Sequence, residues 1–197
     1  NPIVHSELTR AYFKKGKKDL ALREFKRAVY IYMKQNRMDE AVDEYLEISS
    51  ELPEMSLDPP QQMKIAIAIE QRALEAWKTY TEVKAASEKA PKKFAKTTAA
   101  PEWQPEFEAA RDLFSKAVAA YRQLIAHYQR VARTLDSPEG VNALTRYGDI
   151  CVQYLDQPQE AYKAYKMILQ STQLAPEKKP EFQAKAQRVA QMASEQA

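Results

Sequence analysis

The sequence contains little glycine, with three such residues in 197. Tight hairpin turns and phosphate-binding loops depend on glycine, so its scarcity argues against a β-rich protein and against a glycine-rich nucleotide site. No stretch shows a convincing alternation of apolar and polar residues, which a half-buried strand requires. Alanine, glutamine, lysine and glutamate are abundant instead, as helices prefer. The composition therefore predicts an all-α protein.

Cysteine is also scarce. Cys151 is the single cysteine, which excludes an internal disulfide and a cysteine-rich zinc site. It lies in an apolar stretch far in sequence from His5 and His127, so we expect a buried core residue. The sequence has no H-E-x-x-H, G-x-S-x-G, Walker or dinucleotide-binding motif. We therefore expect a protein that is not an enzyme and that uses no metal or other cofactor.

The sequence lacks a strong excess of one charge, and it also lacks a long run of apolar residues. The chain has 30 lysines and arginines and 27 aspartates and glutamates, without the basic bias that is typical of nucleic-acid-binding proteins. The longest apolar run, Ala28–Met33, is far shorter than the ~20 residues of a membrane span. We expect a cytoplasmic protein. The alternative is a periplasmic one whose signal peptide was removed, because the sequence begins at Asn1 instead of methionine.

Proline divides the chain into helical segments, because it is tolerated in the first turn of a helix but not in its interior. Asp58 before Pro59 and Ser137 before Pro138 are typical N-terminal capping residues. The sequence predicts eight helices, at 3–15, 18–35, 38–52, 59–90, 104–135, 138–155, 158–173 and 179–195.

The fourth and fifth predicted helices are long and carry matching apolar seams. Phe107, Ala110, Phe114, Ala117, Tyr121, Leu124, Tyr128, Val131 and Leu135 alternate by three and four on the fifth. Ala66, Ile69, Ala73, Ala76, Tyr80 and Val83 form the seam of the fourth. Because such spacing keeps one face toward a partner helix, we expect an antiparallel hairpin. Its connection, 91–103, contains three lysines with Phe94 and Trp103. It is either a partner-binding tip or a linker whose Trp103 folds back onto the hairpin.

Two overlapping sets of residues near the N-terminus follow the spacing of packed helix pairs. The first is Leu8, Thr9, Tyr12, Gly16, Ala21, Phe25 and Ala28, and the second is Phe25, Ala28, Val29, Tyr32, Asn36, Ala41, Tyr45, Ile48 and Pro53. Both sets resemble the tetratricopeptide (TPR) repeat, although their offset is shorter than the family's 34 residues. Asn36 stands at the turn glycine, where asparagine is tolerated. A looser third set comprises Leu144, Tyr147, Gly148, Val152, Pro158, Ala161, Tyr165 and Ile168.

The resemblance implies a bacterial-type TPR-like protein of antiparallel helix pairs, an α-α superhelix with a long central helical hairpin. We expect one helical domain over 1–197, with TPR-like units at 3–53, the hairpin at 59–135 and TPR-like helices at 138–195. TPR proteins are mostly binding scaffolds, so the resemblance also implies a non-catalytic protein–protein interaction function.

The groove-facing positions of the family fall on the first two predicted helices of this chain. They are basic with interleaved aromatic residues: Arg10, Phe13, Lys14, Lys26, Arg27, Tyr30 and Lys34. This set predicts a protein or peptide partner with acidic character; an ordinary solvated helix face is the alternative. Two other functions stay open, namely an oligomerising structural module built on the hairpin and a nucleic-acid-binding helical domain, which the charge balance disfavours.

Overall fold

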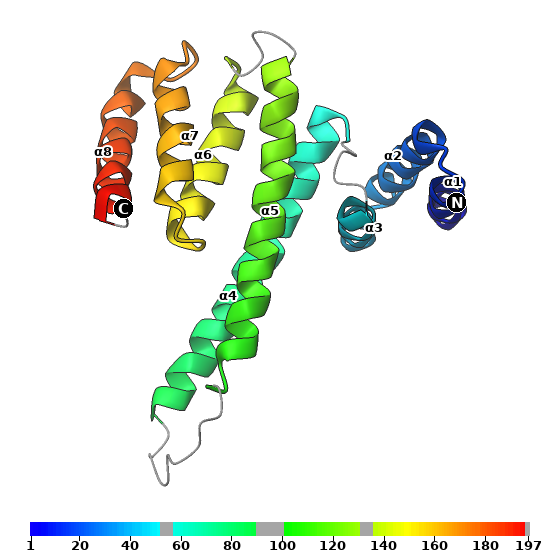
Figure 1. Cartoon of the computed structure of the whole chain (residues 1–197), viewed down its shortest axis with the longest axis horizontal. Coiled ribbons are helices and arrows are strands. Elements are labelled where there is room, and N and C mark those ends of the chain that lie inside the picture. Colours follow the sequence, from blue (N-terminus) through cyan, green and yellow to red (C-terminus); the bar gives the residue numbers. More distant parts are fainter. Residues whose placement is uncertain (52–56, 90–100, 131–135, 196–197) are drawn as a thin grey trace. The chain divides into compact units, whose positions relative to one another are not determined.

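The computed structural model describes residues 1–51, 57–89, 101–130 and 136–195. Within these ranges there are eight α-helices and no β-strand, so the all-α prediction is confirmed (Figure 1). The helices are α1 (Pro2–Lys14), α2 (Lys18–Lys34), α3 (Met38–Glu51), α4 (Pro59–Lys89), α5 (Gln104–Arg130), α6 (Pro138–Gln153), α7 (Pro158–Gln170) and α8 (Lys179–Glu195). A short 3-10 helix, η1 (Pro176–Lys178), precedes α8. The predicted bounds that fall on described residues agree to within a few residues, and the predicted ends at 52, 90 and 135 lie outside the described residues.

The chain divides into two compact units, residues 1–68 and 69–197. α4 begins in the first unit and continues in the second. Successive helices pack against each other in antiparallel fashion: α1, α2 and α3 do so in the first unit, and α5 to α8 in the second (Figure 1). The predicted helix pairs are therefore present, and each unit is described by itself below.

The tight connections between helices depend on residues in the left-handed backbone region. Gly16, between α1 and α2, has φ +69°. Asn36, at the corresponding place between α2 and α3, has φ +57°. The amide of Lys17 donates to the carbonyl of Tyr12 at 2.9 Å, and the amide of Arg37 donates to the carbonyl of Tyr32 at 3.0 Å. This is the hydrogen-bond pattern of a helix C-terminus closed by a left-handed residue. The structure confirms that Asn36 takes the role of the turn glycine.

The core of the first unit lies where α2 and α3 meet. Phe25 is fully buried, and its ring centre lies 6.3 Å from that of Tyr45. The hydroxyl of Tyr45 accepts a hydrogen bond from the buried side-chain amide of Gln62 at 2.8 Å, and the Gln62 carbonyl accepts one from the Leu57 amide at 3.1 Å. A buried amide is costly unless it is hydrogen-bonded, so this chain of bonds fixes the start of α4 against α3.

The long α4–α5 hairpin is present, and its predicted seams are largely buried. All of α5 and the part of α4 from Ile69 onward lie in the second unit. Ala110, Phe114, Ala117 and Tyr121 of α5 have no exposed surface, and Leu124 has almost none. On α4, Ala66, Ile69 and Ala73 are fully buried, whereas Ala76 and Val83 are partly exposed. Val131 and Leu135, at the end of the predicted α5 seam, lie outside the described residues. The two seams therefore pack against each other within one chain.

An aromatic cluster that the heptad pattern does not predict joins the hairpin to α6. Trp77 of α4 lies 6.1 Å from Phe114 and 5.2 Å from Tyr154 between ring centres. Phe114 and Tyr154 are stacked, with a spacing of 3.9 Å and an interplanar angle of 9°. Trp103 folds back onto the hairpin, 5.8 Å from Tyr80, as the linker interpretation predicted. Phe94, the other aromatic residue of that connection, lies outside the described residues.

Two further contacts hold the second unit together. The carboxylate of Glu70 on α4 accepts hydrogen bonds from the Tyr121 hydroxyl at 2.7 Å and from the Arg146 guanidinium at 2.9 Å, which links α4, α5 and α6. Gly148 of α6 lies directly against Tyr165 of α7: a Cβ atom at position 148 would lie 2.8 Å from Cε1 of that ring. The absence of a side chain at Gly148 is therefore what lets α6 and α7 approach so closely.

Candidate functional site

The predicted basic positions on α1 are placed beside α3. The Arg10 guanidinium binds Glu47 with two hydrogen bonds, of 2.9 Å from Nε and 2.6 Å from Nη2, and lies 3.5 Å from Glu44. The Arg10 hydrogen bond holds the pKa of Glu47 below its ordinary value, whereas burial raises the pKa of Glu44. Phe13 is half-buried and Lys14 is exposed. The charge of Arg10 is thus already balanced by carboxylates of the same unit.

The predicted positions on α2 are also engaged within the first unit. The Lys26 ammonium lies 2.9 Å from the Asp58 carboxylate, and Arg27 lies 3.2 Å from Glu24. Lys34 lies over the exposed ring of Tyr30, 4.9 Å from its centre. Sequence reasoning treated these cations as available to a partner because their carboxylate partners lie on other turns or helices. An acidic partner would have to compete with these intramolecular ion pairs.

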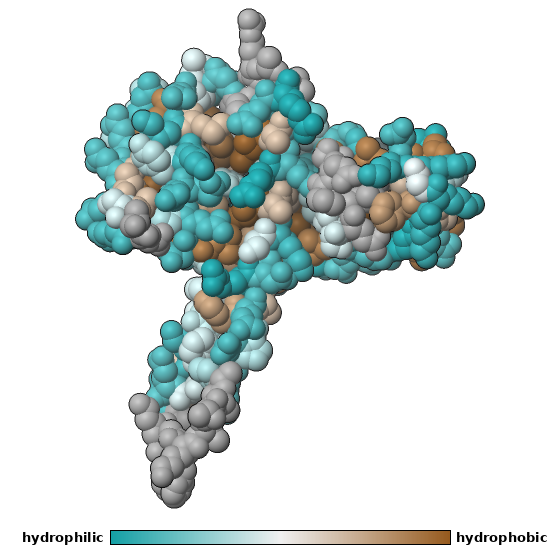
Figure 2. Space-filling view, in the orientation of Figure 1, coloured by the Kyte–Doolittle hydropathy of each residue, from teal (hydrophilic) through white to brown (hydrophobic). Residues whose placement is uncertain are grey.

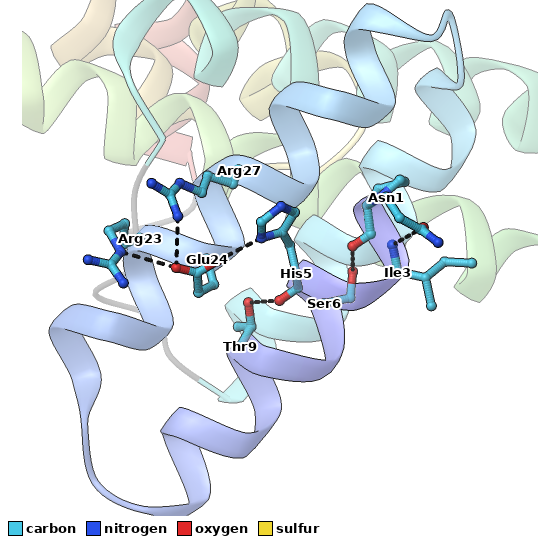
Figure 3. Close-up of polar contacts among 9 residues, drawn as sticks. Asn1, Ile3, His5, Ser6, Thr9, Arg23, Glu24 and Arg27 are labelled. Carbon is cyan, nitrogen blue, oxygen red and sulfur yellow. Dashed lines mark hydrogen bonds and ion pairs between the residues drawn. The ribbon is translucent and has the colours of Figure 1, made fainter.

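Glu24 is the centre of a cluster between α1 and α2 that sequence reasoning missed (Figure 3). Its side chain is almost completely buried, yet its carboxylate is fully partnered. One oxygen lies 2.7 Å from His5 Nδ1, and the other accepts from Arg23 at 3.1 Å and from Arg27 at 3.2 Å. The hydrogen bond with His5 is the main reason that the pKa of Glu24 lies below its ordinary value. The cluster therefore joins α1 to α2 through an ionised carboxylate.

We expect Glu24→Gln to destabilise the protein at neutral pH by about 1.5–3 kcal/mol, the range for hydrogen bonds to a charged group. A lowered folded-state pKa means that the carboxylate stabilises the fold above its unfolded value, near 4.5, and loses this effect as pH falls through the folded pKa. Urea unfolding of both proteins from pH 3 to 7 measures the difference. Glu7→Gln, an exposed change on α1, is the control and should show a small difference at every pH. A Glu24→Gln effect that persists unchanged in acid would contradict this role.

α6 and α8 both line cavities in the second unit. Two cavities of about 350 and 330 Å³ lie along these two helices. The first is lined by Asp149, Val152, Gln153, Tyr165, Lys185, Arg188, Val189 and Met192, and the second by Pro138, Val141, Asn142, Thr145, Gln173, Leu174, Ala175, Lys178, Glu181 and Phe182. The lining residues recur every three or four positions on each helix, so each helix offers one face to the cavities. We call this surface the α6–α8 groove.

A hydrogen-bonded set of three side chains forms part of the wall of this groove. The Tyr165 hydroxyl donates to Asp149 at 2.6 Å, and the Lys185 ammonium lies 3.0 Å from the same carboxylate oxygen. Burial, together with the neighbouring Asp149 carboxylate, raises the pKa of Tyr165, so the phenol stays protonated and keeps donating. The set therefore joins α6, α7 and α8 through one carboxylate.

Cys151 is buried, and burial raises the pKa of its thiol to about 11, so that it is protonated at neutral pH. The predicted buried role of Cys151 is confirmed. Within the ranges that the structure describes, no three His, Cys, Asp or Glu side chains are grouped as a metal site would require.

Comparison with known proteins gives no relative. No family model, no curated protein and no solved structure matches the chain. Among the described helices, none combines the length and apolar character needed to cross a bilayer. The face of the molecule in Figure 2 is mostly hydrophilic, with smaller apolar patches between polar residues. The function must therefore be argued from the geometry of the described residues: eight helices packed in antiparallel pairs, with the α6–α8 groove.

Proposed function

We propose that this protein is a non-catalytic interaction scaffold of TPR-like helix pairs, which binds a segment of a partner protein in the α6–α8 groove. The observation that carries the proposal is the groove itself, because its two cavities follow both helices for most of their length. α6 has 16 residues, which corresponds to about 24 Å at 1.5 Å per residue. A groove of this length suits about seven residues of an extended segment, at ~3.3 Å each.

The helix pairs α1–α2 and α6–α7 support the TPR-like part of the proposal. Each pair has a small, buried residue in its first helix, Thr9 or Gly148, and a buried aromatic residue in its second, Phe25 or Tyr165. Each also turns through a residue with positive φ, Gly16 in one case and Asp156 in the other. Small residues allow helices to approach, and aromatic residues fill the space beside them. The two pairs thus share these features of sequence, burial and turn geometry.

The α1–α2 positions, Arg10, Phe13, Lys14, Lys26, Arg27, Tyr30 and Lys34, stay a second candidate surface. Their intramolecular ion pairs reduce the free positive charge that they offer. Oligomerisation through the hairpin is less favoured than binding, since the α4 and α5 seams already bury each other. The alternative of nucleic-acid binding gains no support from these positions, because Arg10, Lys26 and Arg27 are paired with carboxylates of the same unit.

We expect Gln153→Trp to abolish binding of partner proteins from the native source. Gln153 is exposed and lines the groove, so an indole there fills the space without disturbing the core. Gln187→Trp is the matched control, because Gln187 is exposed on α8 and does not line either cavity. Affinity capture followed by quantitative mass spectrometry compares both variants with the wild type and with Lys26→Glu/Arg27→Glu.

The expected result is a set of proteins retained by wild type and by Gln187→Trp and lost from Gln153→Trp. Loss from Lys26→Glu/Arg27→Glu alone would instead place binding on α1 and α2. Identical sets for all four proteins would contradict binding at either surface. Circular dichroism of each variant shows that any loss is not caused by unfolding.

A further inference from the structure

The end of the α6–α8 groove that lies beyond Asp149 is lined by more cations than carboxylates. This part of the groove contains two cations, Lys185 and Arg188, and one carboxylate, Asp149. Lys185 is held by Asp149 at 3.0 Å and by Glu181 at 3.5 Å. Among the residues that the structure describes, no carboxylate pairs with Arg188, which is exposed at the edge of the cavity. The guanidinium of Arg188 is thus available for a carboxylate of a bound molecule.

Apolar side chains line the same cavity next to Arg188. Val152 of α6 and Met192 of α8 are partly exposed there, and Val189 lies beneath them, almost fully buried. Burying an apolar side chain of a ligand here contributes a favourable free energy of about 25 cal/mol per Å² of apolar surface removed from water. A ligand that fits therefore needs an anionic group and an apolar group next to each other.

The rest of the groove disfavours a polyanion. Glu181 lines the second cavity and Asp149 the first, so a chain of phosphates would meet a carboxylate in each. A basic segment would meet Lys178, Lys185 and Arg188. A single carboxylate placed at Arg188 avoids both repulsions, because it approaches the cation that has no partner among the described residues.

We propose that the partner segment carries an aspartate or glutamate side chain directly beside an aliphatic or aromatic residue. This inference rests on the proposed function. The carboxylate accepts hydrogen bonds from the Arg188 guanidinium, whose planar fork suits two-point binding. The apolar neighbour packs on Val152, Val189 and Met192. The remaining residues of the segment follow the groove toward Thr145 and Glu181.

A displayed library of random peptides of about twelve residues tests this inference against the full chain. The library is selected in parallel on wild type, Arg188→Glu, Gln153→Trp and Arg130→Glu. Arg130 is an exposed residue of α5 that donates to a carbonyl of its own helix, which makes it the matched charge control. Peptides enriched on the wild type are synthesised, and their affinities are measured by calorimetry at low and high salt.

We expect enriched peptides with an acidic residue next to an apolar one, bound by wild type and by Arg130→Glu. Arg188→Glu should weaken them at least ten-fold, and high salt should weaken them as well, because exposed charges are screened. Two results would overturn this inference but not the proposed function. In the first, peptides that Gln153→Trp fails to bind lack acidic residues. In the second, Arg188→Glu binds the peptides as tightly as wild type does. If every enriched peptide binds Gln153→Trp as tightly as wild type, or if no peptide is enriched, both this inference and the proposed function are wrong.

Discussion

Tyr121→Ala is expected to lower the free energy of unfolding by about 3–5 kcal/mol, the range for large aromatic residues truncated in a core. Tyr121 has no exposed surface and occupies the middle of the α5 seam. Truncation leaves a cavity that rigid helices on both sides cannot close. It also removes the hydroxyl that donates to Glu70 at 2.7 Å, so that this carboxylate keeps Arg146 but loses a second partner.

Two variants separate the contributions to this effect. Tyr121→Phe keeps the ring and removes only the hydrogen bond to the Glu70 carboxylate, so it should cost about 1.5–3 kcal/mol, the range for hydrogen bonds to a charged group. Ser115→Ala changes an exposed residue of the same helix, whose hydroxyl binds a carbonyl of that helix, and should have an effect within about 0.5 kcal/mol. Urea titration followed by circular dichroism measures all three. A Tyr121→Ala effect as small as that of Ser115→Ala would mean that the seam does not face α4.

Gly148→Val is expected to destabilise the second unit by about 2–3 kcal/mol through overpacking. A Cβ atom at this position would lie 2.8 Å from Cε1 and 3.2 Å from Cζ of Tyr165. The ring cannot yield easily, because Tyr165 is 1% exposed and its hydroxyl is bound to Asp149. Gly148→Ala should also destabilise, although alanine in a helix interior is otherwise about 1 kcal/mol more favourable than glycine.

A double-mutant cycle shows whether the clash with Tyr165 is the cause. In a Tyr165→Leu background the contact is relieved, so Gly148→Ala should become neutral or stabilising, as helix propensity alone predicts. Thermal or urea unfolding of the four proteins gives the coupling. Equal destabilisation in both backgrounds would contradict the close approach of α6 and α7. Since Tyr165 also lines the α6–α8 groove, Tyr165→Leu should weaken peptide binding.

The helices could be predicted because their signals are local. Ser137 caps α6 by accepting from the Gly140 amide, as its place before Pro138 predicted. The seam of α5 followed from spacing along one helix. Trp77 and Tyr154 were missed because neither lies on a predicted seam; their contact depends on the packing of α6 against the hairpin.

The functional surfaces were harder to predict, because they depend on helices that are not adjacent in sequence. The pairing of Arg10 with Glu47 spans two helices, and no local pattern shows it. The α6–α8 groove requires α6 and α8 to flank α7, which spacing within either helix does not specify. A signal was nevertheless present: Asp149 and Val152 on α6, and Lys185, Arg188 and Met192 on α8, recur at three-and-four spacing as mixed polar and apolar stripes.

Methyl NMR of the protein labelled at its methionines tests binding in the α6–α8 groove most directly. Met192 lines the groove, whereas Met33 and Met38 lie on α2 and α3 in the other unit and serve as internal controls. The labelled full chain is titrated with the peptide most enriched on the wild type. The proposal predicts that the Met192 signal shifts in a saturable way while those of Met33 and Met38 stay in place. A shift of Met33 or Met38 with an unchanged Met192 signal would contradict it.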